Sequence, residues 1–267
     1  MRHLKDHTFA VCAYGESPYL DEAVSSVINQ KLPSRVIICT STPNDHIKSV
    51  ADKYNVSLVI NPEKGDIQTD WNFACNSTDT RYVTLVHQDD LYSPQYLECF
   101  YEKMKKQRDF LIFYTAYRPL NMRDGIGDTH KDANSVIRFI LSIPMLVPFF
   151  SDKTLIKKAI LSFGNSICCP TVTYDRKTIG GAYIFTSELK YDLDWDTYWK
   201  FAKQKGSFLF EPRDLVYYRV HDLATSKQCI DNSVREHDDI YMFSKIFSPS
   251  IAKIIMKAYK MAYLNYR

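Results

Sequence analysis

Apolar segments of strand length alternate with amphipathic segments through the first 117 residues of the chain. Continuous apolar runs predict buried strands, and apolar residues at helical spacing between them predict surface helices. Ser17 and Ser93, each followed by a proline, are the expected N-caps of two of these helices. Strand–helix alternation over short connections predicts an α/β fold with a doubly wound, mostly parallel sheet flanked by helices. The expected strands are 8–14, 35–41, 56–61, 81–87 and 109–117, and the expected helices are 17–30, 44–55, 66–77 and 93–107.

The second half of the chain has a less regular pattern and contains no linker rich in Pro, Gly or Ser. A second independent domain is therefore not expected. Residues 121–134 have the composition of a loop. The elements expected after it are helices near 134–142 and 152–162, a helix at 191–206, a strand at 215–221 and two helices within 231–265.

Charge and cysteine content exclude several classes of protein. The net charge is only +3 and the basic residues are scattered, so a nucleic-acid-binding surface is not expected. Seven cysteines form no CxxC pair, which is typical of a reducing compartment. The N-terminus lacks the pattern of a signal peptide, and the apolar stretch 136–150 is too short and too broken to span a bilayer. A cytoplasmic protein is expected.

Two neighbouring carboxylates, Asp89 and Asp90, follow the apolar strand 81–87 directly. Ligands of parallel sheets bind at the carboxyl ends of the strands, which is where this pair lies. Two buried carboxylates would repel each other, and a divalent cation such as Mn²⁺ or Mg²⁺ removes that conflict. The alternative is that one aspartate caps the following helix and the other is solvated.

A second acidic cluster, formed by Asp192, Asp194 and Asp196, stands at the start of the expected helix 191–206. Acids favour a helix N-terminus, so these residues have a purely structural interpretation. A carboxylate at that position can also act as a general base toward a substrate hydroxyl. His221, at the end of the strand 215–221, is either an ordinary hydrogen-bonded histidine or a further ligand of the cation.

Four blocks of the sequence, in this order, resemble family-2 glycosyltransferases with the GT-A fold. The blocks are VCAYGESPYLDEAVSSVINQ (11–30), NPEKGDIQTDWNFACNSTDTRYVTLVHQDD (61–90), DLDWDTYWKFAKQKG (192–206) and YYRVHDLATS (217–226). They are similar to the family's opening strand and helix, its Asp-x-Asp stretch, its catalytic-base segment and its late Tyr-Arg-x-His segment. The resemblance covers roughly residues 7–225. It implies a GT-A domain at 1–225, with a nucleotide-binding half at 1–117 and an acceptor half at 118–225, followed by a helical extension at 226–267.

The resemblance also implies roles for individual residues. Asp194 corresponds to the catalytic base, and Asp89, helped by Asp90 and His221, would bind the cation. The residues expected to line the nucleotide site are Ala13, Tyr14, Glu16, Thr40, Asn72, His87 and Gln88.

Three positions depart from the family's pattern. His87 stands where the family usually has the first aspartate of the metal motif, Thr40 and Ser41 stand where an acid often reads the base, and Trp71 replaces a frequent basic residue. These departures leave the fold expectation intact and leave the donor's base and sugar open.

The function implied is an inverting, metal-dependent transfer of a sugar from a nucleotide diphosphate sugar, with a UDP-sugar as the expected donor. The implied acceptor is a hydroxyl on a glycan or lipid-linked saccharide in surface-polysaccharide assembly of a bacterial type, at the inner face of the cell membrane. Lys253, Lys257, Lys260 and Arg267 give the tail 249–267 a basic character, with Ile251, Ile254, Ile255 and Ala258 on one helical face. That helix either lies on an anionic membrane or packs its apolar face on the domain.

Two other functions remain open on the same residues. A catalytically weak protein that only binds nucleotide sugars is suggested by His87 and by the missing acid near Thr40. A nucleotidyltransferase would need a phosphate-binding glycine-rich loop after the first strand, and AYGESPY contains a single glycine and no following lysine.

Overall fold

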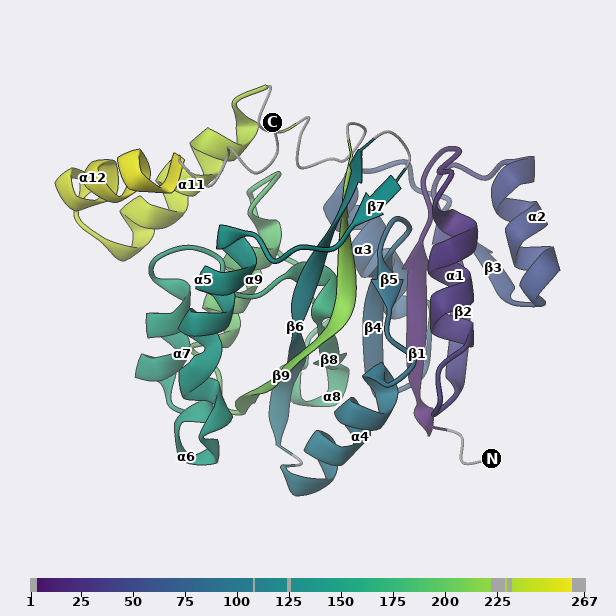
Figure 1. The fold of residues 1–267 in the computed structure, drawn as a ribbon, viewed down its shortest axis with the longest axis horizontal. Helices are drawn as coiled ribbons and strands as arrows, with labels where there is room; N and C mark the ends of the chain where they lie inside the picture. The colour runs from purple at the N-terminus through teal and green to yellow at the C-terminus, as the bar shows by residue number, and fades with distance from the viewer. Residues whose placement is uncertain (1–3, 108, 124–125, 222–228, 230–231, 261–267) are drawn as a thin grey trace.

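The computed structural model describes residues 4–107, 109–123, 126–221, 229 and 232–260. A nine-stranded sheet forms its centre, in the order β3-β2-β1-β4-β8-β6-β9-β5, with β7 paired to β6 (Figure 1). The strands are β1 Leu4–Cys12, β2 Ser34–Thr40, β3 Ser57–Ile60, β4 Tyr82–His87, β5 Leu91–Tyr92, β6 Phe110–Arg123, β7 Ile126–Asp128, β8 Thr173–Asp175 and β9 Ser207–Val220.

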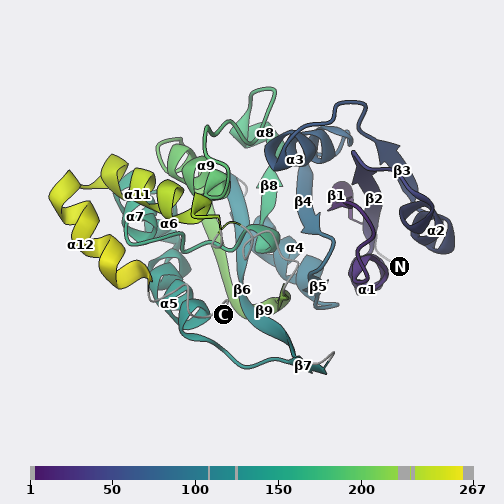
Figure 2. The ribbon, with the colours of Figure 1, turned by 90° about the horizontal axis from the view of Figure 1, so that it is seen from above.

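Helices cover both faces of this sheet, as the view from above shows (Figure 2). The α-helices are α1 Leu20–Ile28, α2 Asp45–Tyr54, α3 Ile67–Asn76, α4 Tyr96–Lys106, α5 Ala133–Ser142, α6 Pro148–Ser151, α7 Thr154–Leu161, α8 Arg176–Ile179, α9 Leu193–Phe201, α11 Val234–Ile246 and α12 Pro249–Tyr259. Two short 3₁₀ helices, η1 Ile143–Leu146 and η2 Cys169–Thr171, complete the described elements.

The parallel core of the sheet confirms the doubly wound α/β fold. β1 pairs in parallel with β2 and β4, β2 with β3, and β6 with β9, whereas β8 and β5 run antiparallel to their neighbours. One buried cluster includes side chains of α1, α2 and α4, and a second includes side chains of α3, α9, α11 and α12. Because parallel strands are buried on both faces, each helix layer seals one of the two clusters.

Two helix starts differ from the sequence-based expectation. α1 begins at Leu20 and α4 at Tyr96, not at Ser17 and Ser93. Each serine hydroxyl instead accepts a hydrogen bond from the backbone N–H two residues later, at 3.3 Å in the first case and 3.4 Å in the second. The Ser-Pro pairs therefore form turns that precede the helices, and the prediction that these serines are N-caps is wrong.

The second half of the chain is more strand-rich than expected. β6 continues to Arg123 and pairs with β7, with Asn121 opposite Asp128, so the loop expected at 121–134 is wrong for 121–123 and 126–128. Residues 124–125 of that prediction lie outside the described residues, and 129–132 have no regular structure. β9 begins at Ser207, eight residues before the expected strand, because it pairs in parallel with β6 along its length. β8 was not expected, since three residues are too short to show a periodic pattern.

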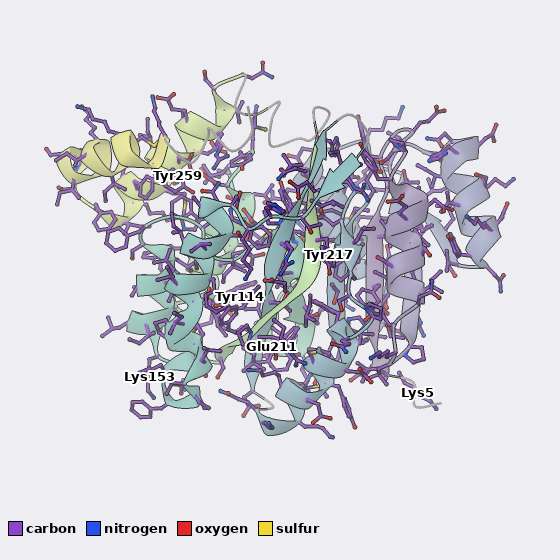
Figure 3. The ribbon with its side chains drawn as sticks, viewed as in Figure 1. Lys5, Tyr114, Lys153, Glu211, Tyr217 and Tyr259 are labelled. Carbon is purple, nitrogen blue, oxygen red and sulfur yellow. The ribbon has the colours of Figure 1, made fainter. Side chains whose placement is uncertain are left out.

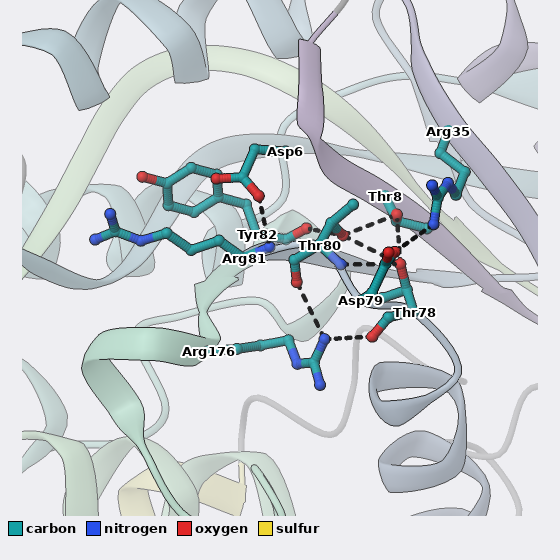
Figure 4. A network of polar contacts seen from close by, with 9 residues as sticks. All are labelled: Asp6, Thr8, Arg35, Thr78, Asp79, Thr80, Arg81, Tyr82 and Arg176. Atoms are coloured by element: carbon teal, nitrogen blue, oxygen red, sulfur yellow. Dashed lines mark hydrogen bonds and ion pairs between the residues drawn. The ribbon is translucent and has the colours of Figure 1, made fainter.

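A polar network ties the first residues of the parallel strands together at the edge opposite the candidate site (Figure 4). The hydroxyl of Thr8 lies 2.8 Å from that of Thr78 and 2.9 Å from that of Thr80, all in buried positions. Asp6 accepts a hydrogen bond from the backbone N–H of Arg81 at 3.0 Å. Buried polar groups are favourable only when satisfied, so this network stabilises the register of β1 against β4.

The C-terminal helices α11 and α12 pack on α9. Met242 and Phe243 of α11 and Ala252 and Met256 of α12 are buried in the same cluster as α9. The side of α12 that carries Ala252 and Met256 thus covers the domain, whereas Ile251 and Ile254 of the expected apolar face are exposed. Residues 261–267 of the predicted basic tail lie outside the described residues. No helix in the described ranges combines the length and apolar character needed to cross a bilayer.

Candidate functional site

A cavity of about 590 Å³ opens at the carboxyl ends of β1, β2 and β4. Its wall combines residues of the first half of the chain with residues of α5, α9 and α11. The structure therefore brings most of the sequence-predicted site residues into one cavity. Those that line it are Ala13, Tyr14, Glu16, Thr40, His87, Gln88, Asp89, Asp194 and His221.

Asp89 and His221 meet at this edge although 132 residues separate them in sequence. His221 Nε2 lies 3.0 Å from Asp89 Oδ2, because the aspartate follows the end of β4 and the histidine follows the end of β9. Burial raises the pKa of Asp89, but the hydrogen bond from His221 and the charge of that imidazole outweigh it, so the pKa is lowered overall. The Asp89 carboxyl group is therefore ionised at the cavity wall.

Asp90 is fully buried beneath Asp89 and does not line the cavity. Its Oδ1 accepts a hydrogen bond from the backbone N–H of Arg219 at 2.9 Å, whereas its Oδ2 has no hydrogen-bond partner among the described residues. Burial and the adjacent charge of Asp89 raise the pKa of Asp90 well above its usual range. This is the conflict between neighbouring carboxylates that the sequence predicts.

Ligand atoms of His87, Asp89 and Asp90 lie within 4.8 Å of one another. Burial lowers the pKa of His87, which keeps the imidazole neutral and able to bind a metal, and its Nε2 has no hydrogen-bond partner in the described part of the chain. Two carboxylates and one imidazole are a donor set suited to Mn²⁺, and the orphaned Asp90 Oδ2 and His87 Nε2 fit that interpretation. His221 adjoins this set through Asp89, so the four residues form one candidate cation site.

Arg219 organises this site, and the sequence interpretation gave it no role of its own. Its guanidinium donates to the Asp89 carbonyl at 2.7 Å and to Glu22 Oε2 at 2.6 Å, and it lies 4.2 Å from the centre of the Tyr19 ring. The side chain is only 3% exposed. The Tyr-Arg-x-His block contained the residue, but its contacts with α1 and the β4 end are visible only in three dimensions.

Asp194 occupies the second position of α9 and faces the same cavity. Its Oδ2 accepts a hydrogen bond from Asn165 Nδ2 at 2.8 Å, and its Oδ1 accepts one from the backbone N–H of Trp195 at 2.8 Å. Burial raises the pKa of Asp194 to about 6, partly offset by the positive charge of Arg138. A carboxylate with this pKa is a better base than an ordinary aspartate and is still ionised at neutral pH.

Backbone contacts fix the loop after β1 against the end of β4. The side-chain amide of Gln88 bonds both backbone groups of Tyr14: it accepts a hydrogen bond from the N–H at 2.8 Å and donates one to the carbonyl at 3.1 Å. Gly15 has φ +59 and donates to Thr42 Oγ1 at 2.8 Å. The Gln88 amide is therefore engaged in holding the loop, and the exposed Tyr14 ring and Glu16 carboxylate are the side chains left to contact a ligand.

Asn72 does not line the cavity, contrary to its predicted place in the nucleotide site. It is buried, and its amide bonds both backbone groups of Phe185, donating at 2.7 Å and accepting at 2.9 Å. Its neighbour Trp71 faces the cavity instead, stacked on His87 with ring centres 5.0 Å apart. Asn72 therefore fixes the backbone at Phe185 and does not contact a ligand in the cavity.

The far wall of the cavity contains residues that the sequence interpretation missed. Asp238 of α11 accepts hydrogen bonds from the backbone N–H groups of Lys190 and Tyr191 at 2.9 and 2.7 Å. The guanidinium carbon of Arg235, on the same helix, lies 5.0 Å from the centre of the Tyr191 ring, and Arg235 Nε lies 3.5 Å from Asp239 Oδ2. Asp192, which precedes α9, is buried near these groups, and burial together with the charges of Asp239 and Asp194 raises its pKa well above the usual range. Arg138, Lys190, Tyr191 and Arg235 all line the cavity, and no local motif marks them.

Comparison with known proteins identifies relatives of the chain. Residues 8–168 match the profile described as "Glycosyl transferase family 2". The chain is 23% identical over 265 residues to an "Uncharacterized glycosyltransferase" of Haemophilus influenzae (strain ATCC 51907 / DSM 11121 / KW20 / Rd), a match that covers 92% of this chain and 73% of that protein.

Solved structures share the fold at lower identity. The mannosyltransferase PcManGT from Pyrobaculum calidifontis, in complex with GDP-Man and Mn²⁺, is similar with a TM-score of 0.63 and 17% identity, over 95% of this chain and 69% of that one. TarS 1-349 of S. aureus, in complex with UDP, is similar with a TM-score of 0.59 and 15% identity, over 99% of this chain and 72% of that one.

Proposed function

Because the chain belongs to glycosyl transferase family 2 and is a glycosyltransferase with the GT-A fold, we propose that it moves a sugar from a nucleotide diphosphate sugar to an acceptor hydroxyl with inversion of the anomeric centre. The observation that carries the proposal is that one cavity is lined by both the Asp89–His221 pair and Asp194. The first can hold a cation and the second can accept a proton. A metal-dependent inverting transfer uses both functions around one donor sugar.

Asp89, Asp90, His87 and His221 are the residues that would hold Mn²⁺ or Mg²⁺. A bound divalent cation neutralises negative charge that develops on a leaving diphosphate. Asp89 faces the cavity with a lowered pKa, and Asp90 lies beneath it, braced by the Arg219 backbone. Similarity in fold to PcManGT, solved with GDP-Man and Mn²⁺, supports this assignment. The donor we propose is a UDP-sugar, in keeping with the fold similarity to TarS solved with UDP.

Asp194 acts as the general base in this proposal. It removes the proton from the acceptor hydroxyl while that oxygen attacks the anomeric carbon, and the electron pair of the broken carbon–oxygen bond leaves with the diphosphate. Asn165 and the Trp195 N–H hold the carboxylate in place, each at 2.8 Å. General-base catalysis contributes about 10²–10⁴ in rate, which is about 3–5 kcal/mol of activation free energy.

The acceptor we propose is a glycan or lipid-linked saccharide in surface-polysaccharide assembly, used at the cytoplasmic face of the membrane. Its side of the cavity is the wall formed by Arg138, Asn165, Tyr191 and Arg235. These side chains offer two cations, an amide and an aromatic ring, which suit a sugar that carries an anionic group.

A nucleotide-sugar-binding protein without turnover is the second candidate, and one observation favours it. His87 replaces an acidic residue of the metal motif and its pKa is lowered by burial, so the cation site has one carboxylate fewer than the family pattern. Such a protein would bind a nucleotide sugar and release no nucleotide with any acceptor.

A thermal-shift screen of nucleotide sugars with and without Mn²⁺ tests the proposal. A ligand present at a hundredfold excess over its Kd stabilises the native state by about 2.7 kcal/mol, which is a readily measured rise in Tm. We expect one nucleotide sugar to raise Tm only when Mn²⁺ is present. The proposal fails if no nucleotide sugar shifts Tm, or if the shift is the same after removal of the metal with EDTA.

A further inference from the structure

The segment 136–155, which we call the α5–α7 face, exposes an unusual number of apolar side chains. Nine of the large apolar or tyrosine side chains exposed in the described residues fall in these 20 positions. Ile137, Ile140, Phe149 and Leu155 are 53%, 56%, 69% and 79% exposed. No charged residue occurs between Arg138 and Asp152. Apolar patches of this kind on a folded protein mark interaction surfaces.

Helix α5 separates this face from the cavity. Successive residues of an α-helix are rotated by about 100°, so positions 136, 137 and 140 share one side and position 138 points about opposite to their middle. Arg138 accordingly lines the cavity, while Val136, Ile137 and Ile140 are exposed. Whatever covers the α5–α7 face therefore lies one helix diameter from the proposed acceptor site.

Exposed lysines lie near the apolar side chains. Segments 131–164 and 248–260 together contain eight lysines and arginines and two aspartates. Of the eight, Arg138 lines the cavity and Lys157 is buried, whereas Lys153, Lys253 and Lys257 are exposed. Both aspartates are engaged locally: Asp132 caps α5 through the Ser135 N–H, and Asp152 lies 3.1 Å from Lys153. Lys153 also lies 4.8 Å from the centre of the Phe149 ring, and it projects from the outer end of the helical region (Figure 3).

Helix α12 also carries exposed apolar side chains next to exposed lysines. Its exposed Ile251 and Ile254 alternate with the exposed Lys253 and Lys257. Figures 1 and 2 both place α12 with α5, α6 and α7 at one end of the molecule, away from α2 and β3 at the other. Apolar side chains bordered by cations bind anionic lipid surfaces, because apolar burial and attraction to headgroups act together. A second copy of the same cationic face would instead be repelled.

We infer that the α5–α7 face docks on an anionic lipid bilayer and thereby presents the cavity to an acceptor held in that bilayer. The inference rests on the proposed function only for the statement that the acceptor is lipid-linked. Membrane contact then involves α5, α6 and the start of α7 in addition to the tail. The residues that penetrate the headgroup region are Ile137, Ile140, Phe149 and Leu155.

Co-sedimentation of the whole chain with vesicles tests the inference without nucleotide or acceptor. We expect binding to vesicles of phosphatidylcholine mixed with phosphatidylglycerol, weaker binding to phosphatidylcholine alone, and loss of binding at high salt. Ile137→Glu and Phe149→Glu should each lower the vesicle partition coefficient by a factor of about ten or more, because burial of one large apolar side chain contributes at least that factor. Ile60→Glu is the matched control, since Ile60 is also 53% exposed but belongs to β3 at the opposite end.

The outcomes separate the docking inference from the proposed activity. Failure of the wild-type chain to bind either vesicle, or equal loss in the Ile60→Glu control, overturns the inference and leaves sugar transfer untouched. Concentration-dependent dimers that Ile137→Glu dissociates, without vesicle binding, would make the face a self-association surface and also overturn it. Tm and the Mn²⁺-dependent nucleotide shift should stay unchanged in Ile137→Glu, which shows that the variant is folded and its donor site intact.

Discussion

The Asp238 carboxylate of α11 lies 2.7 Å from the backbone nitrogen of Tyr191, and it accepts that N–H together with the N–H of Lys190. These two residues precede α9 by one turn, and α9 carries Asp194 at its second position. One buried carboxylate on the C-terminal helical pair thus holds the loop that leads into the proposed catalytic base. Helix α11 therefore helps to position the proposed active site.

Asp238→Ala should lower kcat more than it changes the KM for the donor. The part-buried N–H groups of Lys190 and Tyr191 would lose their acceptor, at a cost of up to about 1–3 kcal/mol each, and the 190–192 loop would relax. The donor site on the other wall keeps its contacts. Because water would then reach Asp194, the pH midpoint of kcat should also fall toward that of an ordinary aspartate, a change that simple destabilisation would not produce.

Glu236→Ala serves as the control for this variant. Glu236 lies on the same helix, and its carboxylate pairs with Lys260 at 2.5 Å. It should leave kcat, KM and the pH midpoint at wild-type values. A positioning role for Asp238 is rejected if Asp238→Ala retains both the wild-type kcat and the wild-type pH midpoint.

Asp194→Asn should abolish most transfer and leave donor binding nearly intact. The substitution removes the proton acceptor but keeps the side-chain volume and one oxygen to accept from Asn165 or Trp195. A loss of about 10²–10⁴ in kcat is expected from removal of a general base. Stopped assays of released nucleotide measure the rate, and the Mn²⁺-dependent rise in Tm measures binding. A variant that keeps more than about a tenth of the wild-type rate, a loss smaller than the low end of that range, would show that another group is the base.

The pH dependence of wild-type kcat/KM should have its acidic limb near the pKa of Asp194, about 6. The ionised form is the active one, so the rate should fall about tenfold for each unit of pH below that value. An exposed aspartate would sustain activity to a pH about two units lower. Measurement of kcat/KM across this range, with the metal saturating at every pH, gives the midpoint.

The same raised pKa predicts a stability difference with a definite sign. Since the folded-state pKa of Asp194 exceeds the ordinary value of 3.8, its contribution to stability is fully present below that value and is lost as the pH rises through about 6. Asparagine cannot ionise. Asp194→Asn should therefore have a higher Tm than the wild type at pH 8 and no such advantage at pH 4. A lower Tm at pH 8 would mean that the charged carboxylate is stabilised in the folded protein.

Much of the first half of the fold could be predicted because its signals are local. Each parallel strand is a continuous apolar run, and the connection after each is short, so β1 to β4 and their helices follow from periodicity. Asp89 and Asp194 could be singled out for the same reason, since each stands next to a recognisable element boundary. The structure brings Asp89 and His221 to within 3.0 Å and places Asp194 in the same cavity.

What could not be predicted depends on packing between distant segments. Arg235 reaches the cavity only because α11 packs on α9, and Asp238 of the same helix bonds the loop at Lys190, 48 residues earlier in the chain. Asn72 was expected at the nucleotide site from its place in the block that resembles the family, but its two hydrogen bonds join it to Phe185, 113 residues away. β8 is three residues long, and its strand geometry comes from its partners β4 and β6.

Asp89→Ala should remove cation-dependent nucleotide binding together with activity. Asp89 offers the anionic oxygen that faces the cavity, and without it His221 loses its partner at 3.0 Å and the buried Asp90 remains with a raised pKa and no exposed ligand atom. Isothermal titration of the nucleotide with and without Mn²⁺ measures the effect, and Asp79→Ala, on the exposed turn before β4, is a control that should behave as wild type. Nucleotide affinity that still rises with Mn²⁺ in Asp89→Ala would place the cation elsewhere. Treatment of the wild type with EDTA should reproduce the variant's loss of affinity, and restored Mn²⁺ should reverse it in the wild type alone.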